Sequence, residues 1–165
     1  MKETYLVFKS PIGDWLLTAV QDKLTKVDLM KDDLLIEETF TPLLIKTSQQ
    51  LEEYFQKKRV IFDLPLNLIG TDFQIKVWQE LLRIPYGSFY SYQKLATQVG
   101  NLQAARAVGQ ANNKNPISII VPCHRVFGKD GKLVGFGNGV EIQQALLKLE
   151  GHQINIKNNN YYVKV

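Results

Sequence analysis

The sequence predicts an α+β protein, in which a short antiparallel meander and one helix are followed by a mainly helical second half. Three runs of strand-forming residues, TYLVF, WLLTAV and LTKVDLM, are separated by turn residues within the first 30 positions. Thr41 and Pro42 then have the form of an N-cap and a first helical position, and apolar residues follow at helical spacing. Beyond Gly70 the pattern changes to short helices with clear capping signals.

The first half contains no group of titratable side chains that suggests a reaction. After the predicted helix, RVIFDL at residues 59–64 has the composition of one more strand. We therefore interpret residues 1–70 as a structural domain of α+β type. Residues 71–165 are expected to form a second domain.

Capping residues mark two helices at the start of this second domain. Thr71 with Gln74 forms a capping-box pattern, and Pro85 stops the helix that follows. Ser91 can cap a second helix, and Gly100 can end it. The apolar face of the first of these helices would comprise Val77, Trp78, Leu81 and Leu82.

A third helix is predicted over QAARAVGQANNKN, residues 103–115. It is nearly bare of bulky side chains, and Arg106, Gln110 and Asn113 form one polar stripe along it. The second and third helices, joined by a tight turn at Gly100, have the outline of a helix-turn-helix. Tight packing against another helix is an alternative explanation for the small residues. The polar stripe favours contact with DNA instead.

Charge and composition limit the classes of function. Residues 71–151 carry 9 basic and 5 acidic groups, whereas residues 1–70 carry 9 and 11. This asymmetry is consistent with a polyanion as the partner of the second half, and ordinary variation of the surface explains the charges equally well. A single cysteine and two distant histidines make neither a disulfide nor a good zinc set, so we expect no metal and no cofactor. The start resembles no signal peptide and no stretch is long enough to cross a bilayer, so we expect a cytoplasmic protein without a membrane partner.

The segment IIVPCHRVFG, residues 119–128, holds the only cysteine. ISIIVP is predicted to be a buried strand, with Cys123 where the chain leaves it. A thiol is a poor nucleophile until a base removes its proton, and His124 is the candidate base. Because neighbouring side chains of an extended segment point to opposite faces, a bridging water would have to relay the proton. Glu150 is the candidate that orients His124. An inert core thiol with an exposed histidine explains the local pattern equally well.

A longer match adds to this interpretation. PCHRV at 122–126, preceded by AARAVGQANNKNP and followed by GFGNGVEIQQALLKLEG, resembles the O6-alkylguanine-DNA alkyltransferases, also called methylated-DNA–protein-cysteine methyltransferases. The match runs continuously from about residue 73 to residue 151 and includes IPYG and SYQKLA. An SPIG turn near the start of the chain matches as well. It implies a ribonuclease-H-like N-terminal domain and a winged-helix-like C-terminal domain that carries the reactive cysteine.

The resemblance also implies an activity and a partner. The protein would repair DNA by direct damage reversal, as a methylated-DNA–protein-cysteine S-methyltransferase that acts once. It would flip O6-alkylguanine out of double-stranded DNA and transfer a methyl or larger alkyl group to its cysteine irreversibly, with O4-alkylthymine as a second candidate substrate. A monomer would approach the duplex from the minor groove.

Individual roles follow by resemblance. Cys123 would accept the alkyl group, with His124 acting through a water and Glu150 behind it, and Arg106 would fill the place of the extruded base. Asn115 would brace the turn between the recognition helix and the active-site strand. The implied guanine pocket consists of Tyr92, which also helps to turn the nucleotide out, Val126 and Phe136. The implied DNA face consists of Ala104, Ala105, Gly109 and Asn113 together with Arg106.

Four positions depart from the family pattern. Phe136 stands where a tyrosine is common, Asn138 where bacterial members often carry tryptophan, and Gln143 and Gln144 where basic residues are frequent. We expect these changes to affect the range of accepted alkyl groups and the strength of DNA binding.

Two other functions share parts of this pattern. A non-catalytic reader of alkylated bases would share the scaffold, but relatives of that kind lack the thiol that Cys123 provides. A Cys-His-Glu hydrolase would turn over repeatedly, and it would leave the slim helix beside the reactive segment without a purpose.

Overall fold

The chain forms two compact units in the computed structural model, which describes residues 1–165. The first unit comprises Met1–Ile69 together with Pro116–Ile120, and the second comprises Gly70–Asn115 together with Val121–Val165. The expected division after residue 70 did not anticipate that the short segment Pro116–Ile120 would pack with the first unit.

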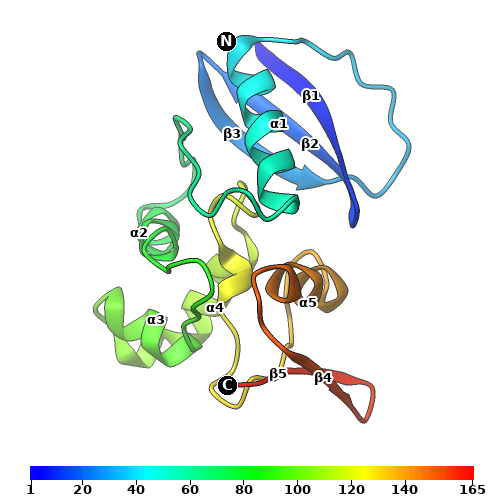
Figure 1. Ribbon diagram of the computed structural model, residues 1–165. Helices are drawn as coiled ribbons and strands as arrows, with labels where there is room; N and C mark the ends of the chain where they lie inside the picture. Colours follow the sequence, from blue (N-terminus) through cyan, green and yellow to red (C-terminus); the bar gives the residue numbers. More distant parts are fainter. The chain divides into compact units, whose positions relative to one another are not determined.

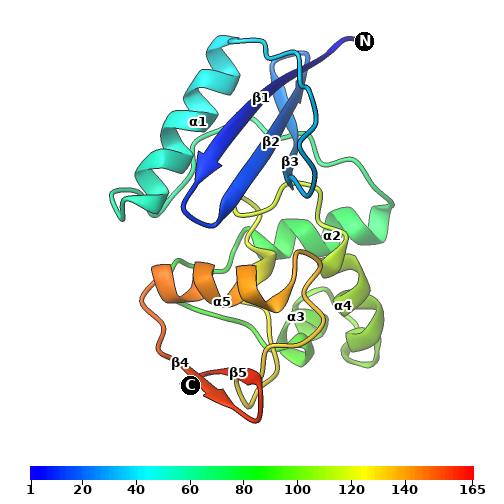
Figure 2. The same cartoon turned by 90° about the vertical axis from the view of Figure 1, so that its right-hand side faces the viewer.

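A three-stranded antiparallel sheet with one helix on its face forms the first unit, as the α+β pattern predicts (Figures 1 and 2). Its elements are β1 (Glu3–Ser10), β2 (Gly13–Val20), β3 (Lys23–Leu29) and α1 (Pro42–Phe55). The register sets Leu6 opposite Leu17 and Phe8 opposite Trp15, and all four side chains are buried. The ring of Phe8 stacks on Phe55 of α1 with 5.9 Å between centroids. Burial of this apolar face is what holds α1 on the sheet.

The free edge of β3 is covered by backbone from two other segments of the same unit. Leu24 N–H donates to the carbonyl of Pro65 at 2.8 Å, and Val27 N–H donates to the carbonyl of Pro116 at 2.9 Å. Each segment adds only an isolated bridge, made by Leu66 and by Ile117. The predicted strand over 59–64 is therefore wrong, because pairing with β3 begins only at Pro65 and Leu66.

The predicted strand ISIIVP is also wrong, because the chain turns sharply inside it. Ile120 N–H donates to the carbonyl of Ser118 at 2.8 Å, which closes a three-residue γ-turn around Ile119. Ile119 has φ +72°, a value that β-branched residues rarely adopt. High β-propensity is overridden here by the need to reverse direction after a single bridge to β3.

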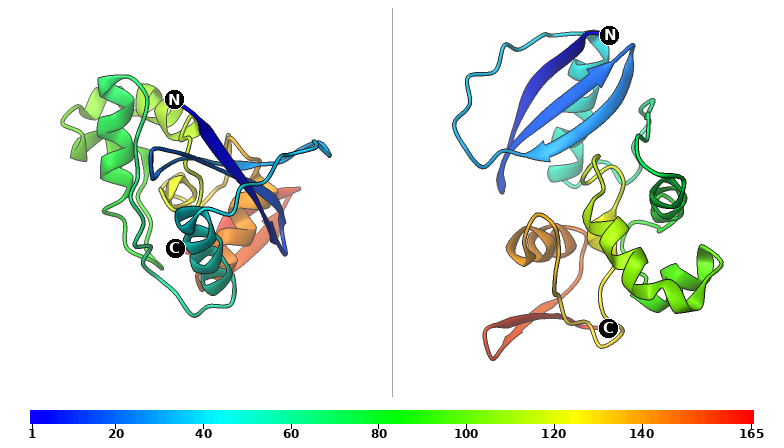
Figure 3. Two further views of the ribbon diagram at one scale, coloured as in Figure 1. Left: turned by 90° about the horizontal axis from the view of Figure 1, so that it is seen from above. Right: turned by 180° about the vertical axis from the view of Figure 1, so that it is seen from behind.

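Helices dominate the second unit, and Figure 3 shows α2, α3 and α4 grouped together. Its elements are α2 (Asp72–Leu81), α3 (Tyr92–Gln98), a 3-10 turn Leu102–Ala104, α4 (Ala105–Asn113), a 3-10 turn Cys123–Arg125, α5 (Val140–Leu149) and the hairpin β4 (Ile154–Lys157) with β5 (Asn160–Val163). No helix in the chain is long and apolar enough to span a membrane.

The capping signals of α2 and α3 are confirmed. The Thr71 hydroxyl accepts from Gln74 N–H while the Gln74 side chain accepts from Thr71 N–H, and Ser91 caps α3 through its own hydroxyl, which accepts from Lys94 N–H. Gly100 has φ +93°, the left-handed geometry that ends a helix. One detail is wrong: Leu82 is 43% exposed, because α2 ends at Leu81 and the chain turns away.

Contacts among α2, α3 and α4 produce the predicted helix-turn-helix outline. The indole N–H of Trp78 on α2 donates to the carbonyl of Ala111 on α4 at 2.8 Å, which fixes the two helices against each other. The third predicted helix begins with a 3-10 turn rather than an α-helical one. The C-terminal hairpin contributes Val163 to a small apolar cluster with Phe127, Leu133 and Leu147.

Candidate active site

Two consecutive tight turns present the cysteine. Cys123 N–H donates to the carbonyl of Val121 at 2.8 Å, and Pro122 has φ −83° and ψ 64°, which defines an inverse γ-turn. Arg125 N–H then donates to the carbonyl of Pro122 at 3.0 Å and closes the 3-10 turn Cys123–Arg125, referred to below as the Cys123 turn. With about three residues per turn, neighbouring side chains diverge by about a third of a circle, not by the half circle of an extended strand. The expectation that Cys123 and His124 point to opposite faces is therefore wrong.

The thiol of Cys123 is almost fully enclosed, at 4% exposure. Burial raises the pKa of this thiol to about 11, and hydrogen bonds from the Asn115 side chain and from the backbone of Cys123 and His124 lower it only in part. The thiol is therefore protonated at neutral pH. Any nucleophilic reaction requires a base that removes the proton as the reaction proceeds.

A buried carboxylate lies against His124. Nε2 of His124 is 2.7 Å from Oε2 of Glu150, and both side chains are inaccessible to solvent. Nδ1 of the same ring is buried and has no hydrogen-bond partner in the protein. A carboxylate acceptor favours the tautomer with hydrogen on Nε2, which leaves the Nδ1 lone pair available to accept a proton.

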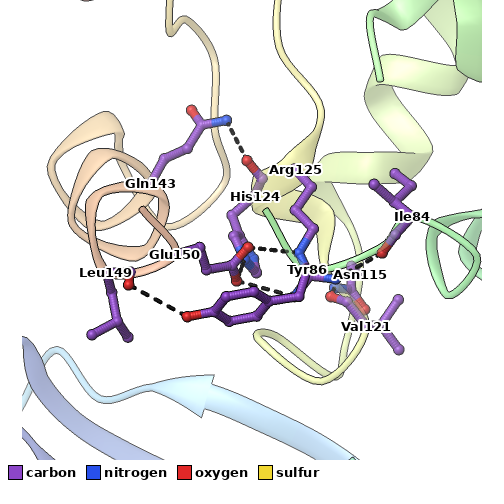
Figure 4. A network of polar contacts seen from close by, with 9 residues as sticks. All are labelled: Ile84, Tyr86, Asn115, Val121, His124, Arg125, Gln143, Leu149 and Glu150. Atoms are coloured by element: carbon purple, nitrogen blue, oxygen red, sulfur yellow. Dashed lines mark hydrogen bonds and ion pairs between the residues drawn. The ribbon is translucent and has the colours of Figure 1, made fainter. Parts of the chain in front are cut away.

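Arg125 is part of the same cluster, and it was not predicted from the sequence. Its guanidinium donates through Nε to Oε1 of Glu150 at 2.8 Å and through Nη2 to Oε2 at 3.1 Å, while Nη1 donates to the carbonyl of Ile84 at 2.7 Å (Figure 4). The Tyr86 ring lies 5.7 Å from the guanidinium carbon. In the sequence this arginine looks like any surface cation, and only its position beside a buried histidine could have indicated otherwise.

The electrostatics of Glu150 follow from these partners. Burial by itself raises the pKa of the carboxyl, but His124 and Arg125 outweigh burial and hold the pKa well below its usual range. Glu150 is therefore an anion throughout the neutral range, which suits it to stabilise positive charge on His124 when that ring takes up a proton.

The C-terminal end of α5 sets the direction of the Glu150 side chain. Glu150 is the C-cap residue; Gly151 N–H donates to the carbonyl of Lys148, and His152 N–H donates to the carbonyl of Leu147. This bonding pattern is a Schellman motif, and Gly151 supplies the required left-handed residue with φ +98°. A carboxylate near a helix C-terminus opposes the helix dipole, and here the guanidinium of Arg125 and the ring N–H of His124 offset that cost.

Tyr92, at the start of α3, packs against α4. A Cβ atom added at Gly109 would lie 3.6 Å from the Tyr92 ring, so the ring lies directly against the glycine of α4. Burial raises the pKa of Tyr92, and the charge of the Cys123 thiolate raises it further, so the hydroxyl keeps its proton. Val126 is buried and bridges to Tyr90, and Phe136 is also buried.

α4 has two distinct faces. Val108, Ala111 and Asn112 are buried, whereas the polar stripe of Arg106, Gln110 and Asn113 is exposed. The remaining small residues predicted for the DNA face, Ala104, Ala105 and Gly109, are half-buried. The helix thus offers a slim outer surface with one arginine near its start.

Two buried amides near the cysteine were not recognised from the sequence. Asn112 donates to the carbonyl of Cys123 at 3.2 Å. Gln143, one of the four positions that depart from the family pattern, is 1% exposed and donates to the carbonyls of His124 and Val126.

A buried thiol beside a histidine–carboxylate pair, in one unit with a helix-turn-helix, defines a class of nucleic-acid-binding proteins with a nucleophilic cysteine. Comparison with known families agrees with that class. Residues 72–152 match the family described as "6-O-methylguanine DNA methyltransferase, DNA binding domain", and residues 1–68 match its "ribonuclease-like domain". The chain therefore belongs to the O6-alkylguanine-DNA alkyltransferase family.

Relatives cover nearly the whole chain. A methylated-DNA–protein-cysteine methyltransferase of Methanosarcina acetivorans is 46% identical over 89% of this chain and 97% of its own length. The constitutive enzyme of that name from Bacillus subtilis is 43% identical over 88% and 94%. A crystal structure of Mycobacterium tuberculosis OGT in complex with DNA superposes with a TM-score of 0.81 at 45% identity, over 89% of this chain and 92% of that chain.

Replacing Glu150 by glutamine should destabilise the protein in a pH-dependent way. At neutral pH we expect a loss of about 3 kcal/mol in the free energy of unfolding, because Arg125 would lose its buried counter-charge. The folded pKa of Glu150 is depressed, so its contribution is complete above the unfolded value of about 4.3 and declines as pH falls below it.

Urea unfolding of the parent protein and of Glu150→Gln between pH 7 and pH 3 measures this difference. The gap should be largest near neutral pH and should narrow below about pH 4. Glu37→Gln, at an exposed position, serves as the matched control. A gap that stays constant down to pH 3 would count against the assigned ion pairs.

Proposed function

We propose that this protein reverses alkylation damage in DNA by moving the alkyl group from O6 of guanine to Sγ of Cys123, once per molecule. The observation that carries the proposal is the His124–Glu150 pair beside a buried cysteine in the unit that also contains the helix-turn-helix. The names of the relatives, and the presence of DNA in the OGT complex, support both the reaction and the partner.

The reaction balances without a metal or cofactor. A bond forms between Sγ and the alkyl carbon while the bond between that carbon and O6 breaks. The thiol proton passes through a water to Nδ1 of His124, and Glu150 stabilises the resulting imidazolium. The Tyr92 hydroxyl gives its proton to a ring nitrogen of the leaving guanine, and the phenolate then takes up the proton held by His124, so that the thiol proton is balanced by the one on guanine and both side chains are restored. The product thioether has no good leaving group, so the cysteine is not regenerated.

Base flipping is required because the thiol is buried. A buried Sγ cannot reach an atom within stacked duplex DNA, and extruding a base costs a few kcal/mol. Arg106, exposed on α4, is proposed to enter the duplex from the minor groove and fill the vacated place. The small residues Ala104, Ala105 and Gly109 allow the backbone to come close, and Asn113 extends the contact. One copy of the chain supplies all these groups, so we propose a monomer as the active form.

The same geometry suggests a substrate pocket. We assign Tyr92, Val126 and Phe136 to its walls, with Asn115 bracing the adjoining turn by donating to the carbonyl of Val121 at 2.7 Å. Phe136 offers no hydroxyl, so the wall it forms is fully apolar. Larger alkyl groups on guanine O6, and O4-alkylthymine, are further candidate substrates. We propose the cytoplasm as the location of the protein.

A non-catalytic reader of alkylated bases is the second candidate. An S. pombe protein solved with DNA containing O6-carboxymethylguanine is 31% identical over 58% of this chain, with a TM-score of 0.52. Cys123 favours transfer over recognition alone, because a reader has no need for a thiol with a base beside it. A hydrolase would need a second nucleophile to release its covalent intermediate and would show repeated turnover.

The direct test is intact-protein and peptide mass spectrometry after incubation with duplex DNA containing O6-methylguanine. We expect one methyl group per molecule, located on the peptide that holds Cys123, because Sγ belongs to the only thiol in the chain. Cys123→Ala should bind the duplex and remain unmodified. Multiple turnovers, or the absence of the adduct from a folded parent protein, would refute the proposal.

Arg106→Ala should separate flipping from chemistry. Without the inserted guanidinium the extruded state loses stability, so repair of duplex DNA should slow by about tenfold or more. Transfer from free O6-benzylguanine, which needs no flipping, should stay close to the parent rate. Arg83→Ala, an exposed arginine outside α4, is the control. An equal loss with both substrates would contradict the role given to Arg106.

A further inference from the structure

Amide side chains hold four backbone carbonyls of the reactive segment. Asn115 donates to the carbonyl of Val121 at 2.7 Å, and Asn112 donates to the carbonyl of Cys123 at 3.2 Å. From α5, Gln143 donates through one Nε2 to two carbonyls, that of His124 at 3.2 Å and that of Val126 at 3.1 Å. Every carbonyl from Cys123 to Val126, except that of Arg125, thus receives a side-chain N–H.

The carbonyl of Arg125 completes the set, since it accepts from Tyr90 N–H at 2.9 Å. Buried carbonyls require donors, and a short 3-10 turn has few backbone N–H groups to offer them. Asn112 and Gln143 are each 1% exposed, so no solvent competes for these bonds. The orientation of the turn is therefore set by the two helices that carry these amides.

Neither amide acts on the thiol itself. The hydrogen bonds that affect the Cys123 thiol come from Asn115 and from the backbone of Cys123 and His124. Oδ1 of Asn112 and Oε1 of Gln143 are buried and have no partner, so each side chain bonds only through its N–H end. A buried side-chain oxygen without a donor costs free energy, and two such oxygens lie beside this one turn. That cost favours a specific role for the N–H groups of the same two side chains.

We propose that Asn112 and Gln143 are positioning residues for alkyl transfer, which act by fixing the Cys123 turn so that Sγ approaches the alkyl carbon in line with the bond that breaks. This inference rests on the alkyl transfer to Cys123 proposed above. Displacement of a reacting atom by about 1 Å can cost about a hundredfold in rate, so hydrogen bonds to the backbone of the nucleophile have a large effect.

Asn112 adds a connection to the DNA-facing helix. It is the residue of α4 that precedes Asn113, and it points inward while the stripe of Arg106, Gln110 and Asn113 faces outward. The hydrogen bond from Asn112 to the carbonyl of Cys123 therefore couples any movement of α4 on DNA to the backbone of Cys123. Gln143 holds the other end of the turn from α5, the helix that also supplies Glu150.

The test uses Asn112→Leu and Gln143→Met, which remove the donor with little change in volume. Single-turnover transfer of the benzyl group from free O6-benzylguanine is measured against its concentration, per folded molecule. We expect the maximal rate to fall about tenfold, with a similar half-saturating concentration, duplex affinity and pH profile, because His124 remains the base. Gln143→Lys, which restores an N–H donor, should recover most of the rate.

Gln144→Met, the neighbouring half-buried glutamine of α5, is the matched control and should react like the parent. If an apolar variant does not fold, Asn112→Ala and Gln143→Ala replace it, because they also remove the donor. Folded variants with maximal rates close to that of the parent would overturn the positioning role, as would a loss that Gln143→Lys does not reverse. A parent protein that transfers no benzyl group would instead refute the proposed function.

Discussion

The carboxylate of Glu150 is the interaction on which the rest of the site depends. It is bound on one side by the imidazole of His124 and on the other by the guanidinium of Arg125, with all three side chains buried. The guanidinium in turn donates to the carbonyl of Ile84, just beyond α2. One buried anion therefore joins α5, the Cys123 turn and the end of α2. Removing it would leave the buried guanidinium of Arg125 without a counter-charge and the buried N–H of His124 without an acceptor.

Burial also explains how a reactive thiol can be kept inert until it is needed. The high pKa of Cys123 keeps the sulfur protonated, which protects it from stray electrophiles. In the proposed reaction, the thiol becomes nucleophilic only when a substrate occupies the site and His124 accepts the proton. A protein that is consumed by each reaction gains from this arrangement, since every accidental alkylation would cost a whole molecule.

Local signals were the reliable part of the sequence. Caps such as Thr71 with Gln74, and the strand-forming runs separated by turns in the first 30 residues, are decided by neighbours along the chain, and the structure confirms them. ISIIVP was misread because its conformation depends on a distant partner: β3 accepts a single bridge at Ile117, and the chain must then reverse at Ile119. Arg125 and Gln143 were missed for the same reason, since their partners lie 25 and 19 residues away. Polar residues look like surface residues until the fold supplies their acceptors.

We infer that Glu150 fixes His124 with hydrogen on Nε2 and a free lone pair on Nδ1. Nitrogen-15 NMR of the imidazoles at about pH 8, above the ordinary histidine pKa of about 6.5, tests this directly. His152→Gln would assign the two rings. We predict that Nε2 of His124 has the chemical shift of a protonated nitrogen and Nδ1 that of a bare one. Glu150→Gln should change the ratio of the two neutral tautomers. Hydrogen on Nδ1 with a bare Nε2 would contradict the account.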